Sequence, residues 1–250
     1  MNKGNKVRVG IVSLGCAKNQ VDAEIMAGEL TEAGYIITPE PEQAQIIVIN
    51  TCGFIDAAKQ EAIDTILEMA EYKKTGTCKA LIVTGCLAQR YFTEIQENLP
   101  EVDGIVGIGG FKNICDAVEN VCAAGSYFNK DEDLSLAYLN GSRILFTPRG
   151  SAYLKIAEGC DNRCHYCAIP AIRGPFRSRP MEELLQEAER LAGEGVKELV
   201  LIAQDTTRYG KDLYGEPKLI ELVQALNQID GIRWIRIMYL YPDEITENLI

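Results

Sequence analysis

Four short apolar runs lie in the first 125 residues, and a segment of helical periodicity follows each of them. The runs are rich in β-branched residues and end at turn residues, which is typical of buried strands. They cover residues 7–14, 46–49, 80–84 and 105–106. Helices are predicted at about residues 19–33 and 56–72, directly after residue 86, and at about 113–122. Strands that alternate with helices predict an open, parallel, Rossmann-like α/β sheet.

The second half of the chain begins with a less regular segment, residues 123–150, whose Gly, Asn and Pro content is typical of turns and linkers. Strands and helices then alternate again. The predicted elements are strands 152–157, 198–203 and 232–239, helices 181–193 and 219–227, and a helix that starts at Pro242 and continues to the end. A complete (β/α) barrel takes about 250 residues, and only about a hundred are present here. We therefore predict two domains, residues 1–145 and 146–250, the second an incomplete, truncated barrel.

The composition favours an intracellular enzyme. The chain has 250 residues with 47% apolar content, which is enough for a full core. No apolar stretch approaches the roughly 20 residues of a membrane helix. The N-terminus leads straight into a predicted strand, without the apolar segment of a secretory signal. A cytoplasmic location without membrane association is therefore expected, and cysteines there stay reduced and available as ligands.

The net charge is −11, from 25 Lys and Arg against 36 Asp and Glu. Proteins that bind nucleic acid usually present a basic surface, because contacts with phosphate drive their affinity. An acidic chain more readily accepts a basic or neutral partner. One local exception is a group of arginines around residues 160–180, at positions Arg163, Arg173, Arg177 and Arg179.

Three of the nine cysteines follow directly on predicted strands. Cys16, Cys52 and Cys86 come after the first three strands, at spacings of 36 and 34 residues. Ligands of open parallel sheets bind outside the carboxyl ends of the strands. We therefore expect these three residues, called the first trio below, to meet at one sheet edge and to bind a metal. The alternative is that each is a small buried hydrophobic residue, which is common for free cysteine.

Another three cysteines form a Cys-x-x-x-Cys-x-x-Cys cluster at Cys160, Cys164 and Cys167, the second trio. Three protein ligands leave one iron of a 4Fe–4S cluster open to an outside ligand. Zinc is an alternative, but its only histidine partner, His165, directly follows Cys164 and adjacent residues rarely bind one ion well. A redox dithiol would leave Cys160 without a role. The remaining cysteines are predicted to be packing residues: Cys78, Cys115 and Cys122.

The cysteine cluster after the first barrel strand resembles the signature of radical S-adenosylmethionine (SAM) enzymes. The segments around the first trio, Leu-Gly-Cys-Ala-Lys-Asn at 14–19, Asn-Thr-Cys-Gly at 50–53 and Thr-Gly-Cys-Leu-Ala-Gln at 84–89, resemble the methylthiotransferase domain. Residues 50–59, 172–180 and 202–210 are similar to the branch that modifies an aspartate of a ribosomal protein (RimO type). The tRNA-modifying branch usually carries an Arg-Gly-Arg-Glu-Arg-Ser-like segment where this chain has Gly-Pro-Phe-Arg-Ser at 174–178.

This resemblance implies two 4Fe–4S clusters, one on each trio, and SAM as radical source and methyl donor. SAM bound at the second trio would yield a 5′-deoxyadenosyl radical that takes a hydrogen from the β-carbon of an aspartate in small-subunit ribosomal protein twelve. The first trio would carry the sulfur of the methylthio group. An electron donor such as flavodoxin or ferredoxin is implied as a partner, tRNA is an unlikely one, and no acid or base residue is assigned.

Two further residues are expected to contact the cofactor, one from the resemblance and one from its place in the barrel. Tyr166 is similar to a residue that borders the adenine of SAM, the alternative being an ordinary core aromatic. Gln204, at the end of the second barrel strand, faces the cofactor side by the logic of barrels, the alternative being a plain strand-end hydrogen bond. Arg173, Arg177 and Arg179 could hold the cofactor carboxylate or the substrate, against a solvated basic loop. Two alternative functions remain: a tRNA adenosine methylthiotransferase, and a non-catalytic iron–sulfur or zinc module.

Overall fold

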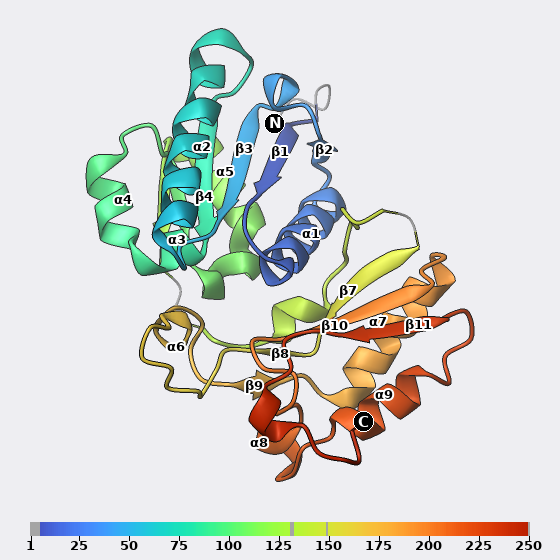
Figure 1. Cartoon of the computed structure of the whole chain (residues 1–250). Coiled ribbons are helices and arrows are strands. Elements are labelled where there is room, and N and C mark those ends of the chain that lie inside the picture. Colours follow the sequence, from blue (N-terminus) through green and yellow to red (C-terminus); the bar gives the residue numbers. More distant parts are fainter. Residues whose placement is uncertain (1–5, 131–132, 149, 250) are drawn as a thin grey trace. The chain divides into compact units, whose positions relative to one another are not determined.

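A computed structural model describes residues 6–130, 133–148 and 150–249 of the chain. The chain divides into two compact units, Met1–Ile144 and Leu145–Ile250 (Figure 1). Part of the predicted linker, residues 131–132 and 149, lies outside the described residues, as do the first five residues. None of the described helices is long and apolar enough to cross a membrane.

The first unit is built on a six-stranded parallel sheet with the strand order β2-β1-β3-β4-β5-β6. This confirms the open parallel sheet expected from the sequence. The outermost strands, β2 and β6, were missed, because each has only three residues and pairs along one side. The strands are β1 (Arg8–Ser13), β2 (Ile36–Thr38), β3 (Ile46–Thr51), β4 (Ala80–Gly85), β5 (Gly104–Val106) and β6 (Tyr127–Asn129).

Helices cover this sheet because its central strands are apolar on both sides. Every residue of β3 and β4 is buried, as expected for a parallel sheet with helices on both faces. Ile49 and Val83 pack with Ile66 of α2 and Leu87 of α3 in one core cluster. The helices are α1 (Ala17–Glu32), α2 (Asp56–Thr75), α3 (Cys86–Arg90), α4 (Phe92–Asn98) and α5 (Ile114–Ala124), with 3-10 turns η1 (Pro41–Gln43), η2 (Ile108–Asn113) and η3 (Ala137–Asn140).

The second unit contains a three-stranded parallel sheet in the order β11-β10-β7 and a separate antiparallel pair, β8 with β9. Leu154, Leu199 and Leu201 of the sheet pack with Leu184 of α7 and Leu222 of α9. The strands are β7 (Ser151–Lys155), β8 (Ala157–Glu158), β9 (Arg177–Ser178), β10 (Glu198–Ile202) and β11 (Trp234–Ile237). The helices are α6 (Ile169–Arg173), α7 (Met181–Gly193), α8 (Lys211–Tyr214) and α9 (Leu219–Leu226).

The prediction of a helix from Pro242 to the end was wrong for the described residues. Pro242–Glu244 forms a single 3-10 turn, η4, and residues 245–249 contain no helix, with a turn at 247–249. Proline and acidic residues favour the first turn of a helix, but the first turn is unfavourable by itself and depends on later hydrogen bonds and packing.

Two candidate cysteine sites

The first trio lies at the ends of three neighbouring strands. β1 pairs with β3 and β3 pairs with β4, so the strands that precede Cys16, Cys52 and Cys86 are adjacent in the sheet. The register aligns Ser13 with Asn50, and Asn50 with Thr84. The strand order reverses at β1, which has β2 on one side and β3 on the other. The edge beyond such a reversal is the usual ligand-binding place of an open α/β sheet.

The backbones of the three cysteine loops approach one another closely. A Cβ atom placed on Gly15 would lie 2.6 Å from Cβ and 3.0 Å from Sγ of Cys52. A Cβ atom on Gly53 would lie 2.8 Å from Cα of Leu87, the residue after Cys86. The two glycines therefore allow the loop of Cys52 to lie directly against both of the other loops.

Gly85 completes this close approach at the end of β4. Its backbone has φ +91° and ψ −160°, a conformation that is essentially restricted to glycine. A Cβ atom there would lie 2.4 Å from Oδ1 of Asn50 and 2.5 Å from the carbonyl oxygen of Thr51. The turn from β4 into Cys86 therefore depends on glycine for both space and backbone conformation.

Asn19, in the first turns of α1, is a fully buried polar residue that the sequence analysis gave no role. Its Nδ2 donates to the carbonyl oxygens of Leu14 and Thr51, and the thiol of Cys86 donates to its Oδ1 at 3.7 Å. The signal that could have found it is an asparagine among buried apolar positions of a helix, three residues after a candidate ligand.

The second trio lies in an irregular loop between β8 and α6. The pair β8–β9 aligns Glu158 with Arg177 and so closes the base of this loop. The Cys160 N–H donates to the carbonyl oxygen of Gly174 at 3.1 Å, and the Asn162 N–H donates to the Cys160 sulfur at 3.4 Å. Burial, followed by the charge of Asp205, raises the pKa of the Cys160 thiol.

Further contacts of the loop join it to the sheet of the second unit. Asp161 accepts a hydrogen bond from the backbone N–H of Phe176, and Asn162 donates to Asp205 at 2.9 Å. Tyr241 lies next to Cys164: the charge of Cys164, and then a hydrogen bond with it, raises the pKa of the Tyr241 hydroxyl. The loop is therefore fixed at both ends by neighbouring elements.

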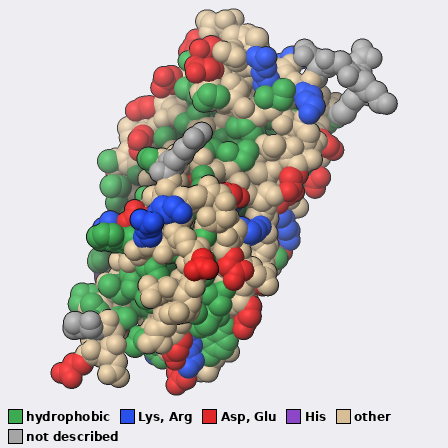
Figure 2. All heavy atoms as spheres, turned by 90° about the vertical axis from the view of Figure 1, so that its right-hand side faces the viewer, with side chains coloured by type: hydrophobic (Ala, Val, Ile, Leu, Met, Phe, Trp, Pro, Cys, Tyr) green, Lys and Arg blue, Asp and Glu red, His purple; other side chains and the backbone are tan. Residues whose placement is uncertain are grey.

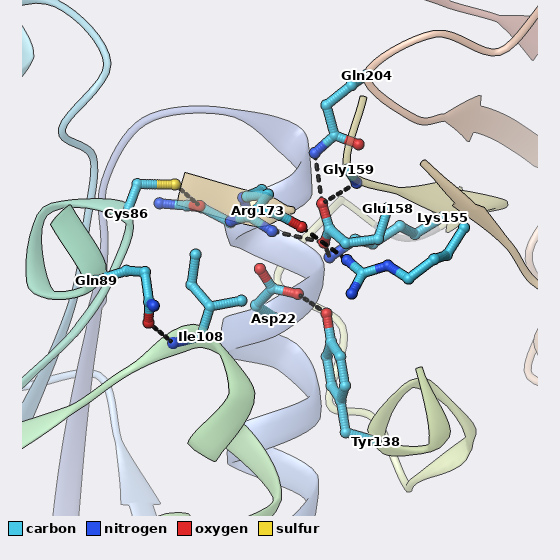
Figure 3. Close-up of polar contacts among 12 residues, drawn as sticks. Asp22, Cys86, Gln89, Ile108, Tyr138, Lys155, Glu158, Gly159, Arg173 and Gln204 are labelled. Atoms are coloured by element: carbon cyan, nitrogen blue, oxygen red, sulfur yellow. Dashed lines mark hydrogen bonds and ion pairs between the residues drawn. The ribbon is translucent and has the colours of Figure 1, made fainter. Parts of the chain in front are cut away.

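A buried ionic network stands at the base of this loop. Glu158 forms ion pairs with Lys155 and with Arg173, and it accepts hydrogen bonds from Gln204 and from the Gly159 N–H (Figure 3). The three charged side chains are at most 1% exposed. Burial alone would raise the pKa of Glu158, but the charges of Arg173 and Lys155 outweigh it and hold this pKa well below its usual range.

The other predicted cofactor residues differ in their surroundings. Tyr166 is 84% exposed, which excludes a core aromatic. Gln204 makes a strand-end hydrogen bond to Glu158, while its Oε1 is buried without a hydrogen-bond partner among the described residues. The solvated basic loop is excluded for Arg173, which pairs with Glu158, and for Arg179, which pairs with Glu187; both arginines are 1% exposed.

The remaining cysteines are not all packing residues. Cys78 is buried as predicted, but Cys115 is partly exposed and Cys122 is exposed on α5. Burial is the main cause that raises the pKa of the Cys115 thiol to about 11. The prediction was wrong for Cys122. The helix α5 buries only one of its faces, which includes Val118 and Val121, and Cys122 lies outside that face in solvent.

Both trios fit a thiolate-bound cluster by their donor chemistry and by their backbone. The first trio lies on three loops at adjacent strand ends and the second in a single loop, and all six cysteines are free. Three thiolates are the protein ligands of a 4Fe–4S cluster with one open iron. At Gly159, a Cβ atom would lie 2.0 Å from the carbonyl oxygen of Pro175, so the second loop lies as close to its neighbour as the first. Within the described part of the chain, no three His, Cys, Asp or Glu side chains converge as in a loaded metal site.

Two family models match the chain in separate regions. Residues 8–107 match the uncharacterized protein family UPF0004, and residues 154–249 match the radical SAM superfamily. Among solved structures, a radical S-adenosylmethionine methyltransferase, TsrM of Kitasatospora setae, with cobalamin and a [4Fe-4S] cluster bound, is similar in fold. The TM-score is 0.60 at 12% identity, over 92% of this chain and 56% of that one. The chain therefore has the fold of radical SAM enzymes.

Curated relatives give a closer assignment. The ribosomal protein uS12 methylthiotransferase RimO of Acetivibrio thermocellus is 56% identical over 98% of this chain, and that of Pelotomaculum thermopropionicum is 52% identical over 98%. The chain belongs to the family of radical SAM methylthiotransferases. It spans about half the length of the curated relatives it matches, 55% in each of these two.

Proposed function

We propose that this chain forms the cluster-binding part of a methylthiotransferase that acts on an aspartate β-carbon of ribosomal protein uS12. The observation that carries the proposal is the pair of three-cysteine sites, one at three adjacent strand ends and one in a single loop. The relatives that are half identical over nearly the whole chain bear the name of this activity. Residues 1–145 would form the methylthiotransferase domain and residues 146–250 part of the radical SAM domain.

Each trio would hold one 4Fe–4S cluster, the first through Cys16, Cys52 and Cys86, and the second through Cys160, Cys164 and Cys167. When bound, the second cluster supplies the electron that cleaves SAM, which is chemistry of the cofactor rather than of the protein. The protein supplies position: Glu158 and Arg173 fix the two ends of the loop that carries the second trio.

Two residues beside the second trio are proposed to contact SAM. Tyr166 presents a ring that is free of the core, so it is available to stack on an adenine. Gln204 keeps a buried amide oxygen that has no partner among the described residues, and such an acceptor suits a donor on the cofactor. The other amide atom, Nε2, is held by Glu158, which fixes the direction of this oxygen.

The charge of the chain supports a protein substrate rather than tRNA. The net charge of −11 favours encounter with a basic ribosomal protein over a polyphosphate. On the face drawn in Figure 2, Lys and Arg side chains lie in small groups among acidic and apolar ones rather than in one basic surface. The proposal includes a cytoplasmic location and a reducing partner of the flavodoxin or ferredoxin class.

Anaerobic reconstitution tests the two clusters. The chain should take up about eight irons, four for each cluster. A variant with Cys160, Cys164 and Cys167 replaced by Ala should bind half as much iron, and a variant with the first trio replaced should bind the other half. Full iron uptake by either triple variant would contradict the assignment of that trio.

The substrate is tested with the complete protein that carries this sequence, purified without oxygen and offered both uS12 and tRNA. Mass spectrometry should find one methylthio group on one aspartate of uS12 and unmodified tRNA. Replacing the second trio should stop release of 5′-deoxyadenosine, while replacing the first should stop methylthio transfer and leave some of that release. A methylthiolated adenosine in tRNA beside unmodified uS12 would overturn the substrate and leave the clusters standing.

A further inference from the structure

Asn19 contacts all three loops that carry the first trio. Its Nδ2 donates at 3.0 Å to the carbonyl oxygen of Leu14, two residues before Cys16. The same Nδ2 donates at 2.9 Å to the carbonyl oxygen of Thr51, the residue before Cys52. Its Oδ1 accepts from the thiol of Cys86. The partners of this one buried amide lie 5, 32 and 67 residues from it in the sequence, one at the end of each of three strands.

The orientation of this amide follows from its partners. The two carbonyl oxygens accept only, so they face the N–H groups of Asn19 and leave its Oδ1 toward the thiol. Asn19 is 0% exposed, so an amide turned the other way would leave buried carbonyl oxygens facing an oxygen. The network therefore has one consistent arrangement.

A second asparagine holds the backbone of the first. Asn50, at the end of β3, donates through Nδ2 to the carbonyl oxygen of Asn19 at 2.6 Å. Thr51 in turn donates through its hydroxyl to the carbonyl oxygen of Thr84 at 2.6 Å, which joins β3 to β4 next to Cys86. The start of α1 and the ends of β1, β3 and β4 are thus joined by polar side chains rather than by apolar packing alone.

We propose that Asn19 is the positioning residue of the first trio: it sets the spacing of the three cysteine loops before any metal binds. This inference rests on the proposed function, because it takes the first trio as a ligand set. Cys86 must lose its proton to bind a metal, and its hydrogen bond to Asn19 then ends. The two bonds to Leu14 and Thr51 do not involve that proton, so they are the contacts that act in the loaded site.

Aspartate is the sharpest replacement, because it keeps the size of asparagine and lacks its donors. Asn19→Asp puts carboxylate oxygens against the carbonyl oxygens of Leu14 and Thr51, whereas Asn19→Ala removes the side chain altogether. The matched control is Val21→Ala, which removes two methyl groups from an equally buried position of the same helix and touches no cysteine loop through a hydrogen bond.

The experiment uses the full chain with Cys160, Cys164 and Cys167 replaced by Ala, so that the first trio is the ligand set measured. The probe is arsenite, a thiol-seeking species that takes up to three sulfur ligands. Asn19→Asp and Asn19→Ala are expected to weaken arsenite binding about 10- to 100-fold, the usual effect of losing a residue that orients ligands. The arsenite affinity of Val21→Ala should stay within about twofold of the parent, although this variant should lose about as much stability as the Asn19 variants.

Arsenite binding by either Asn19 variant as tight as that of Val21→Ala would overturn the proposal. If circular dichroism shows that Asn19→Ala does not fold, Asn19→Asp and Asn19→Ser decide the question. The Asn19→Ser variant keeps one donor, so its arsenite affinity should lie between those of Asn19→Asp and the parent. Reconstitution with iron and sulfide separates the two claims. The proposed function alone would be refuted if arsenite binding weakens in the Asn19 variants as expected but the parent loads no iron–sulfur cluster. The positioning role alone would be refuted if the parent and both Asn19 variants load a cluster and all three give the same reduced electron paramagnetic resonance spectrum.

Discussion

The two cysteine trios reach similar donor sets by opposite routes. In the first unit the cysteines are 36 and 34 residues apart in sequence, and they follow strands β1, β3 and β4, which are neighbours in one sheet. In the second unit they are 4 and 3 residues apart in one loop, and the fold only has to hold the ends of that loop. The first site is therefore a product of folding, whereas the second is largely a local property of the chain.

Each unit also uses a different kind of support around its cysteines. The hydrogen bonds described between the strand ends of the first trio are made by neutral amides and hydroxyls, with Asn19 and Asn50 at the centre. Beside the second trio they are charged, with Glu158 between Lys155 and Arg173. Neutral hydrogen bonds bring separate strands into register at low desolvation cost, while a buried ion pair is strong only when every partner is present.

The largest expected effect on stability is that of Glu158→Gln. It leaves Lys155 and Arg173 buried without their carboxylate, which should lower the free energy of unfolding by about 3–5 kcal/mol. Urea unfolding measures the loss, and hydrogen exchange should place it in the second unit. Glu198→Gln, at the exposed ion pair with Arg236, is the control and should change little.

The same variant should change the pH dependence of stability. The pKa of Glu158 is lower in the folded chain than in the unfolded one, so its contribution is present above the unfolded pKa of about 4.3 and is lost as the pH falls toward the folded value. Glu158→Gln should therefore flatten the loss of stability below about pH 4. If the variant and the parent lose the same stability below about pH 4, the charge of Glu158 does not contribute to the stability of the fold.

Unfolding should separate the two trios. In the unfolded chain, closing loops of 36 and 34 residues rather than 4 and 3 is less favourable by about 4 kcal/mol in total, or about a thousand-fold in affinity. Variants that keep only one trio each, titrated with arsenite in strong denaturant, measure this difference. In the folded chain the difference in arsenite affinity between the two trios should be much smaller. Equal affinities in denaturant would contradict the view that the first site depends on the sheet.

Gly85→Ala should weaken the first unit by more than Gly34→Ala does. Both glycines have positive φ, but a Cβ atom on Gly34 meets nothing within 4 Å, whereas on Gly85 it meets Asn50 and Thr51. Gly34→Ala therefore measures backbone strain alone, about 1–2 kcal/mol. The added clash, together with a backbone conformation that is essentially restricted to glycine, should make Gly85→Ala worse by about 1–3 kcal/mol in thermal or urea unfolding. Similar losses in the two variants would show that the strand ends can move apart freely.

The smallest effect on stability is expected for Tyr166→Ala. The side chain is exposed, and exposed substitutions usually change the free energy of unfolding by no more than about 0.5 kcal/mol. Binding of SAM to the reconstituted chain should nevertheless weaken, because the exposed ring is proposed to stack on the adenine. Urea unfolding measures the stability of this variant, and calorimetry measures its affinity for SAM. A loss of stability without a loss of SAM binding would assign Tyr166 to packing.

Much of the fold could be predicted from the sequence, because it is written in local patterns. Apolar runs marked β1, β3, β4 and β10, and β3 and β4 are buried along their whole length, as expected for strands covered on both faces. The edge strands β2 and β6 escaped because three residues carry no periodicity. The helix expected after Pro242 failed because its start signals are local, while its continuation depends on packing.

For the candidate sites, the sequence by itself determined which residues are available as ligands: the spacing of the second trio, and the position of each member of the first trio after a strand. Only the tertiary structure decided that β1, β3 and β4 are neighbours, that Asn19 joins their ends, and that Arg173 and Arg179 are buried in ion pairs rather than solvated. The physical reason is range. Periodicity and spacing act between near neighbours in the chain, whereas the partner of a buried amide or charge is chosen by whichever distant segment the fold brings into contact with it.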